Sequence, residues 1–366
     1  MISIADVRER LCTVSEARDK VAPLEGLGST SFEQDGSSNV RISLPEDWNS
    51  ALKAMGDNDV TLATITLDDG PERQLTKSAA LKLTSEVGIT KEFMARIPGP
   101  MIEPIVNHLY STGEKSLQLV HSVNVGLGVT RAALLPLSMT RLINEAVDAI
   151  HTTYGADTEI LVDKRMNIGL DDTTVHLIVP EVERSMHSKF AAEEGNDPWS
   201  AGIMVSTSLL GMHPTEAAGY LLRYTCTNGQ TTTHGTHKRK RNEDRENIYS
   251  WAKEQIELLL GGMEHEFDAV DALNEIELEG ELAGRDGLLA QIYSEYRVPK
   301  SAQSLITDEL VESDDITGYG LQAAITRSAQ APEISWKDQA RLMAVGGVLP
   351  HALGSRCPQC HSLPHH

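Results

Sequence analysis

The sequence predicts an α+β protein, in which a mainly antiparallel sheet core lies between an N-terminal and a C-terminal helical region. Two observations lead to this prediction. Segments with the two-residue alternation of β-strands cluster in the middle of the chain, and segments with helical periodicity follow this cluster instead of alternating with its strands. A chain of 366 residues can bury a large core, in one elaborated domain or in two. We divide it into residues 1–113, 114–241, 242–349 and 350–366.

The first region, residues 1–113, is predicted to be mostly helical. Ile4, Val7 and Leu11 lie on one face of an expected opening helix. The Gly- and Ser-rich residues 26–39 are typical of a linker or mobile loop. One strand is expected where β-branched residues alternate before a turn, and three helices follow it. The strand is at residues 60–67, and the helices are at 77–87, 91–97 and 101–111.

The second region, residues 114–241, is predicted to form an antiparallel sheet. Two turn sequences, Gly169-Leu170-Asp171-Asp172 and Gly211-Met212-His213-Pro214, each separate two strand-like segments, which indicates two hairpins. The expected strands are residues 117–120, 129–137, 159–167, 173–179, 203–210 and 218–225, with one helix at 139–150.

The third region, residues 242–349, is predicted to be helical and acidic. Asn242 or Asp244 can cap a long helix with Ile248 and Trp251 on its apolar face. Further amphipathic segments are expected at residues 286–296, 301–311, 320–328 and 335–344.

Composition limits the class of protein. There are 53 Asp and Glu against 32 Lys and Arg, so the formal net charge is -21, which keeps a protein soluble and disfavours a general coat of nucleic acid. No apolar run is long enough for a membrane helix and the first residues do not form a signal peptide, so we expect no membrane partner and a cytoplasmic location. In a reducing compartment Cys12, Cys226, Cys357 and Cys360 are expected as free thiols or metal ligands.

The segment 229–241 is the most informative part of the sequence. It contains no carboxylate and ends in His237-Lys238-Arg239-Lys240-Arg241. From Glu243 to Asp286 there are fourteen Asp and Glu but only three Lys and Arg, so the change from basic to acidic is abrupt. A clustered set of cations in an acidic protein favours an anionic partner, above all nucleic acid. The other interpretations are a solvated hairpin tip and a loop that rests on the acidic helix.

A second motif closes the chain. Cys357, Cys360 and His365 follow the Cys-x2-Cys-x4-His spacing of the first three ligands of a zinc knuckle. The fourth ligand could be His361, His366, His351 or a residue of a partner chain. Zinc is therefore the one cofactor that the sequence indicates, with Cys357, Cys360, His361 and His365 as candidate ligands. The alternative is a disordered tail.

No catalytic signature is present. The chain has no phosphate-binding loop that ends in Gly-Lys-Ser/Thr, no Gly-x-Ser-x-Gly and no complete dinucleotide fingerprint. Arg223, Cys226 and Asn228 form a polar cluster before the basic segment, but no nucleophile and base stand there at a recognised spacing. We identify no catalytic residue.

These residues also carry a resemblance. Gly128 to Ala132, Val205 to Ser208 with Gly211, the stretch Arg223 to Gly229 (RYTCTNG) and Tyr319 to Ala329 resemble an uncharacterised family of prokaryotic proteins carried by phages and plasmids. Thr207 and Leu209 depart from the family, where Asn and an acidic residue are expected. The resemblance implies a mobile-element protein and no established activity. In outline, the expected fold is also similar to phage single-strand annealing recombinases, an analogy of fold and not of function.

Three hypotheses follow. The first is a phage-type protein that binds nucleic acid and acts in DNA replication, single-strand annealing or recombination, in the cytoplasm of a host cell. Its binding residues would be His237, Lys238, Arg239, Lys240 and Arg241, supported by Arg223. The second is an acidic interaction protein that forms a homo-oligomer or binds a host or phage protein. The third is an enzyme of unknown reaction that uses Arg223, Cys226 and Asn228.

Overall fold

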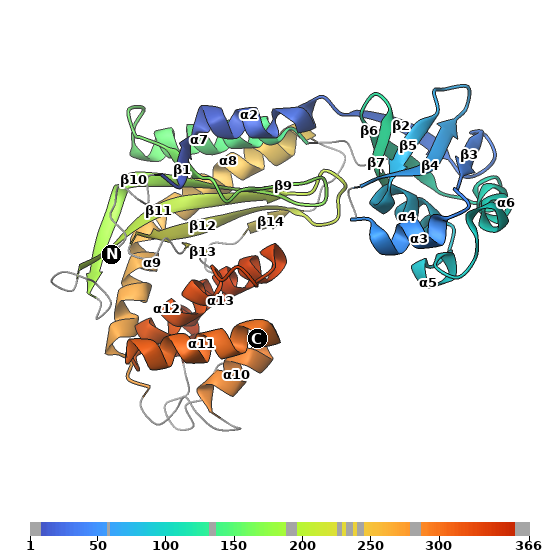
Figure 1. Cartoon of the computed structure of the whole chain (residues 1–366). Helices are drawn as coiled ribbons and strands as arrows, with labels where there is room; N and C mark the ends of the chain where they lie inside the picture. The colour runs from blue at the N-terminus through green and yellow to red at the C-terminus, as the bar shows by residue number, and fades with distance from the viewer. Residues whose placement is uncertain are drawn as a thin grey trace.

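The computed structural model describes residues 9–56, 59–131, 137–187, 196–224, 229–231, 237–239, 245–278 and 287–355. These residues form two units, each built on its own sheet and its own hydrophobic core (Figure 1). Helices and mainly antiparallel sheets are both present, so the predicted α+β class is confirmed.

The small unit contains a six-stranded sheet in the order β2-β6-β7-β5-β4-β3, antiparallel except for the parallel pair β5 and β7. Side chains of α4 and α6 form a core with one face of the sheet, and alternation along β4 leaves its other face exposed. The strands are β2 (Gly28–Glu33), β3 (Val40–Ser43), β4 (Val60–Leu67), β5 (Arg73–Thr76), β6 (Ser116–His121) and β7 (Val125–Arg131). The helices are α3 (Trp48–Ala54), α4 (Lys77–Glu86), α5 (Lys91–Met94) and α6 (Gly99–Tyr110).

This sheet differs from two sequence expectations. Residues 26–39, expected as a linker, include β2, which pairs with β6 along its whole length. The same pairing joins segments from both sides of residue 113, where we expected a regional boundary. Residues 1–113 therefore contain helices, as predicted, and also contribute four strands to a sheet that the following segment completes.

The large unit contains an eight-stranded sheet, and every strand pairing in it is antiparallel. Both predicted hairpins are confirmed: β9 pairs with β10 around residues 169–172, and β11 pairs with β12 around residues 208–214. The strands are β1 (Leu11–Thr13), β8 (Leu161–Asp163), β9 (Asn167–Ile168), β10 (Thr173–His187), β11 (Asn196–Thr207), β12 (Thr215–Arg223), β13 (Gly229–Thr231) and β14 (His237–Arg239).

The start of the described chain belongs to the large unit. Leu11, expected on a helix, lies in β1 and pairs with Asp163 of β8. Thr13 then caps α2 (Val14–Glu25) by a capping box with Glu16, in which each side chain bonds the other's backbone amide. Because α2 packs against α7 (Met139–Tyr154), the small unit is an insertion between two neighbouring helices of the large unit.

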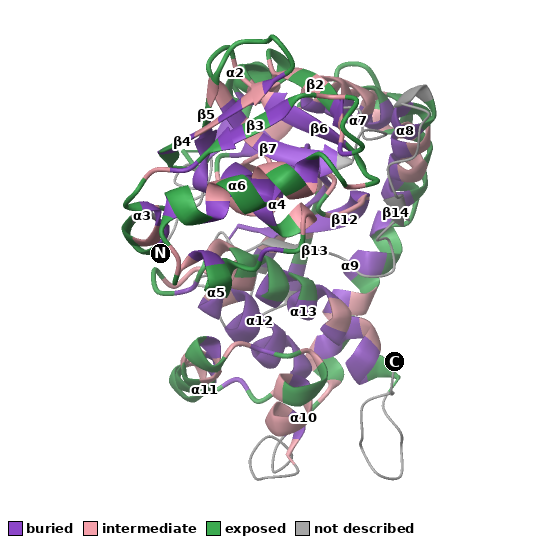
Figure 2. Ribbon diagram, turned by 90° about the vertical axis from the view of Figure 1, so that its right-hand side faces the viewer, coloured by how far each residue is buried: buried purple, intermediate pink, exposed green. Residues whose placement is uncertain are grey.

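Helices lie on both sides of the large sheet (Figure 1). On one side α2, α7 and α8 (Arg245–Gly261) pack together, and α9 (Met263–Asp271) leads to the other side. There α12 (Gly318–Ser328) and α13 (Trp336–Gly354) face the strands, and α12 is almost completely buried (Figure 2). The remaining helical segments are η1 (Ala272–Glu275), α10 (Leu288–Glu295) and α11 (Lys300–Ser313).

A buried ion pair joins the sheet to α12. Arg223 Nη2 lies 2.5 Å from Asp197 Oδ2, and both side chains are completely buried. Tyr319 of α12 donates its hydroxyl to Asp197 and accepts a hydrogen bond of 3.0 Å from Trp199 Nε1. The guanidinium carbon of Arg223 lies 5.2 Å from the centroid of the Tyr319 ring, within the range of a cation–π contact. These four side chains come from β11, β12 and α12, and they supply opposite charge and hydrogen-bond partners to one another.

Replacing only one ion of this pair should be costly. In Arg223→Ala the carboxylate of Asp197 stays buried without its cation, so the free energy of unfolding should fall by about 3–5 kcal/mol. The double variant Asp197→Leu/Arg223→Met should recover much of this loss, because it buries no uncompensated charge. Urea unfolding followed by tryptophan fluorescence measures both effects. Equal destabilisation by the single and the double variant would show that the two charges do not act as a pair.

Candidate functional site: a cavity between the large sheet and α13

A cavity of about 920 Å³ lies between one face of the large sheet and α13. This volume is within the roughly 300–1,000 Å³ that is usual for small-molecule sites. The strand residues in its wall share one face because His176 pairs with Met204 and Ser206 pairs with Glu216 in register. The cavity is lined by Asn167, Asp172, Thr174, His176, Met204, Ser206, His213, Pro214, Glu216, Trp336, Lys337, Ala340, Met343 and Ala344.

The carboxylate of Asp172 connects the cavity walls. Thr174 Oγ1 donates to its Oδ1 over 2.9 Å, and Asn167 Nδ2 donates to its Oδ2 over 3.1 Å. Ser206 Oγ of β11 and Trp336 Nε1 of α13 complete the set at 3.3 and 3.4 Å. Partial burial opposes ionisation of this carboxyl, but the hydrogen bonds, first among them that from His213, outweigh burial and lower the pKa of Asp172 to about 2. Asp172 is therefore an anion that ties the first turn of α13 to two hairpins.

His213 is the cationic partner of Asp172. Its Nε2 lies 3.2 Å from Asp172 Oδ1 and its Nδ1 lies 2.8 Å from the carbonyl oxygen of Pro214. Both ring nitrogens face acceptors, so the doubly protonated imidazolium is the form that matches this environment. The hydrogen bond to Asp172 accordingly raises the pKa of His213 above its ordinary value of 6.5. The two turns thus contribute a charge pair that is neutral as a whole.

His176 is a neutral histidine in the cavity wall. Burial lowers the pKa of His176 to about 4, so the imidazole is uncharged at neutral pH. Its ring lies 4.4 Å from the ring of Tyr220, centroid to centroid. Among the residues that the structure describes, its Nδ1 has no hydrogen-bond partner although the side chain is buried. A buried polar atom without a partner costs about 1–3 kcal/mol, which a ligand atom in the cavity would offset.

A second ion pair, between buried Asp163 and half-buried Arg165, lies behind His176. Arg165 binds both carboxylate oxygens of Asp163, with Nε at 3.0 Å from Oδ1 and Nη2 at 2.5 Å from Oδ2. Arg165 also donates to Gln330, just after α12. Burial opposes ionisation of Asp163, yet the bonds from Arg165 outweigh it and lower the pKa of Asp163. The charges beneath the cavity are therefore compensated before any ligand enters.

The basic segment runs along the edge of the sheet beside this cavity. β14 pairs with β12 in the register Lys238 to Glu216 and Arg239 to Thr215, and Glu216 lines the cavity. The expectation of a basic loop is therefore wrong for His237–Arg239, because main-chain pairing holds these residues in an edge strand. Lys240 and Arg241 lie outside the described residues.

Arg223 does not belong to this surface. Its side chain is fully buried against Asp197, so it cannot contact an external phosphate as we expected. Cys226 and Asn228, the other members of the proposed enzymatic cluster, lie outside the described residues.

The predicted zinc ligands Cys357, Cys360, His361 and His365 also lie outside the described residues, and the zinc site stays a prediction. Within the described part of the chain, no group of three or more His, Cys, Asp or Glu side chains could hold a metal ion. Nor does that part contain a helix long and apolar enough to cross a lipid bilayer.

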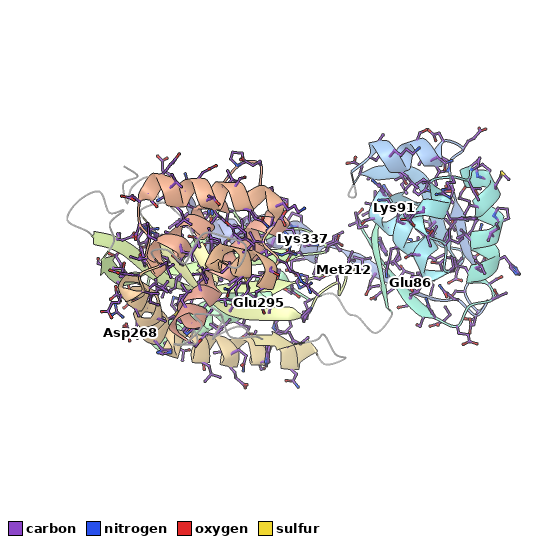
Figure 3. The ribbon with its side chains drawn as sticks, turned by 90° about the horizontal axis from the view of Figure 1, so that it is seen from below. Glu86, Lys91, Met212, Asp268, Glu295 and Lys337 are labelled. Atoms are coloured by element: carbon purple, nitrogen blue, oxygen red, sulfur yellow. The ribbon has the colours of Figure 1, made fainter. Side chains whose placement is uncertain are left out.

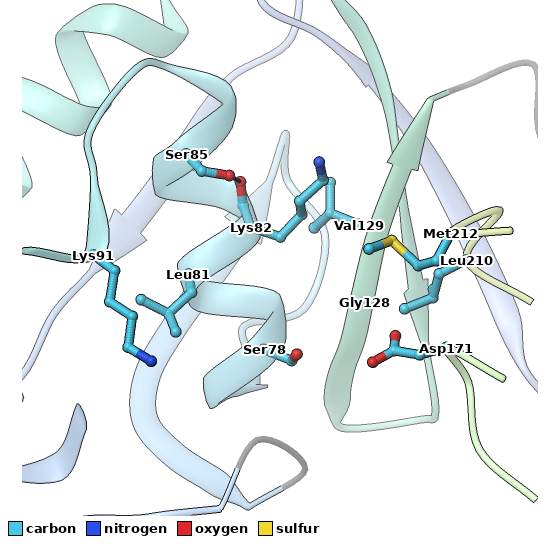
Figure 4. A pocket seen from close by; sticks show the side chains of 10 residues that line it. All are labelled: Ser78, Leu81, Lys82, Ser85, Lys91, Gly128, Val129, Asp171, Leu210 and Met212. Carbon is cyan, nitrogen blue, oxygen red and sulfur yellow. Dashed lines mark hydrogen bonds between the residues drawn. The ribbon is translucent and has the colours of Figure 1, made fainter. Parts of the chain in front are cut away.

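A smaller cavity of about 290 Å³ lies where the two units meet. Lys82 and Lys91 of the small unit stand opposite Asp171 and Met212 of the large unit (Figure 4). Lys82 already forms an ion pair of 2.6 Å with Glu86. Leu210 packs so closely on Gly128 that a Cβ atom there would lie 2.5 Å from its methyl carbon. This contact makes the cavity part of the junction between the units.

Met212 and Lys337 both lie at the end of the large unit nearest the small unit (Figure 3).

Sequence reasoning located both turns but not the site they form. Asp172 and His213 were part of the two predicted hairpin turns, and no motif marked them as partners. The missing step was the pairing of β10 with β11, which brings the two turns to the same end of the sheet. The one available signal was that each turn carries an ionisable residue at its third or fourth position.

Comparison with known proteins adds no relative: no family model, curated protein or solved structure matches this chain. Function must therefore be argued from the site itself.

The Asp172–His213 pair predicts a pH-dependent stability. Because the pKa of His213 is raised in the folded chain, its contribution is fully present below about pH 6.5 and is lost as the pH rises through the folded value. The unfolding free energy of the wild type minus that of His213→Gln should therefore decrease from pH 6 to pH 9. Asp172→Asn should return the pKa of His213, followed by NMR titration, toward its ordinary value. An unchanged pKa in Asp172→Asn would contradict this assignment.

Proposed function

We propose that this protein binds nucleic acid, with the phosphate backbone along β14 and its continuation through Lys240 and Arg241. The observation that carries the proposal is the register of Lys238 with Glu216, which sets the most cationic segment of the chain beside the wall of the cavity under α13. A role in DNA replication, single-strand annealing or recombination follows from this binding and from the resemblance to phage and plasmid proteins.

Single-stranded nucleic acid fits this arrangement better than a duplex. A net charge of -21 repels the dense charge of a duplex over most of the surface, whereas a flexible strand can follow one short basic edge. In a single strand the bases are also unpaired and free to turn toward a neighbouring cavity.

Four cations set the expected salt dependence. If Lys238, Arg239, Lys240 and Arg241 each neutralise one phosphate, the logarithm of the binding constant should fall with a slope of about -2.8 against the logarithm of salt concentration. From 50 to 200 mM salt this slope corresponds to a loss of about 50-fold in affinity.

Replacing these four cations by Ser should abolish binding to labelled single-stranded DNA at 50 mM salt, measured by fluorescence anisotropy, and leave the melting temperature nearly unchanged. A matched control replaces the exposed Lys20, Lys53, Arg96 and Lys300 by Ser, which changes the net charge by the same amount elsewhere. The control should bind as the wild type does. Retained binding in the first variant, or equal losses in both, would contradict binding through β14.

A second candidate function is protein binding or self-assembly. On β4 of the small unit, Leu62 is 69% exposed and Val60 44%, on the face of the sheet opposite the core. Apolar side chains on an exposed sheet face favour contact with another protein surface. The partner would be a second copy of the chain or a host or phage protein. Mass measurement by light scattering, with and without 0.5 M salt and without DNA, should give more than one chain per particle if this candidate holds.

A further inference from the structure

The cavity beside β14 has an interior that does not require a charged ligand. Asp172 and His213 compensate each other at 3.2 Å, and His176 is uncharged. Lys337 is exposed and Glu216 half-buried. A ligand can therefore place an uncharged group inside while any charge it carries stays outside.

The other walls suit a flat ring. Met204 and Met343 line the cavity from opposite sides, one from the sheet and one from α13. The indole nitrogen of Trp336 donates a hydrogen bond to Asp172, which fixes the indole ring at the start of α13. Sulfur and aromatic groups make favourable contacts with planar ring systems. A ligand ring between such walls would be contacted on both faces. Only its edge would then be available for hydrogen bonds.

One residue of the wall has an unused hydrogen-bonding atom. His176 lines the cavity, and its Nδ1 is buried without a hydrogen-bond partner among the described residues. Because the ring is neutral, this nitrogen can accept or donate according to its tautomer. Amino, imino and carbonyl groups on the edge of a nucleobase offer both kinds of partner.

We infer that the cavity holds one unpaired nucleobase of the bound strand, enclosed by Met204, Met343 and Trp336 and hydrogen-bonded to Nδ1 of His176. This inference rests on the proposed nucleic-acid binding and extends it. The phosphate of the same nucleotide stays outside on β14, since Lys238 is paired in register with the cavity residue Glu216. The basic strand thus supplies attachment and the cavity supplies contact with a base.

Blocking the cavity tests the inference. Ala340 is an exposed residue of α13 that lines the cavity, so Ala340→Trp should fill the opening without disturbing the core. Ala22→Trp is the matched control, because Ala22 is exposed on α2 on the other side of the sheet. The probes are a labelled single-stranded DNA and a strand of equal length and charge that consists of abasic sites.

The wild type and Ala22→Trp should bind the intact strand about tenfold more tightly than the abasic strand, a difference that base–aromatic contacts typically produce. Ala340→Trp should bind both strands as weakly as the wild type binds the abasic strand. His176→Phe, which keeps a ring beside Tyr220 but removes Nδ1, should lose a large part of the same difference.

The outcomes separate the two proposals. Equal binding of intact and abasic strands by the wild type, or an unchanged preference in Ala340→Trp, overturns the base site while binding through β14 stands. Absence of binding to either strand at 50 mM salt overturns the proposed function. Isothermal titration with free nucleosides then tests whether the cavity binds a base. Binding that Ala340→Trp abolishes and Ala22→Trp retains supports a base site, and absence of binding overturns it.

Discussion

Asp172 accepts hydrogen bonds from β9, β10, β11, the turn before β12 and α13, so this one carboxylate joins the elements that surround the cavity. Without Asp172, the indole nitrogen of Trp336 and the imidazole of His213 would lose the acceptor that they share. An ionised carboxylate with five donors is more rigid than an apolar contact, because each donor limits the direction from which the others can approach. The residues that shape the cavity are therefore set in place before a ligand binds.

The large unit compensates buried charge at each end of the sheet. Asp163 and Arg165 lie behind the cavity, and Asp197 and Arg223 lie at the far ends of β11 and β12. Ion pairs of this kind contribute little net stability compared with apolar packing, but they select one arrangement, because any other would leave a buried charge alone. In this chain they fix α12 and the turn after it against the sheet through Tyr319 and Gln330. α13 follows directly and forms the other wall of the cavity.

Local features of the fold could be predicted from the sequence, and the site could not. The turns at 169–172 and 211–214 depend on residues adjacent in the chain, so the sequence indicated both hairpins correctly. The site depends on contacts between distant residues: Asp172 is 41 residues from His213 and 164 from Trp336, and Tyr319 is 122 from Asp197. The same limit explains the error at Arg223. Asp197 lies on the neighbouring strand, and only the pairing of β11 with β12 brings it against Arg223.

The sign of the charge on β14 bears on its function. Edge strands often carry Lys or other charged residues that prevent pairing with another sheet, and β14 is such an edge in the described part of the chain. Charge of either sign can protect an edge strand from pairing with another sheet. Carboxylates outnumber cations in this chain by 53 to 32. Yet residues 229–241 contain no carboxylate, and the pattern reverses immediately after them. Protection of the edge does not explain this exclusive choice of cations. The proposed anionic partner, which would lie along the edge next to a cavity with compensated charges, accounts for both the sign and the position.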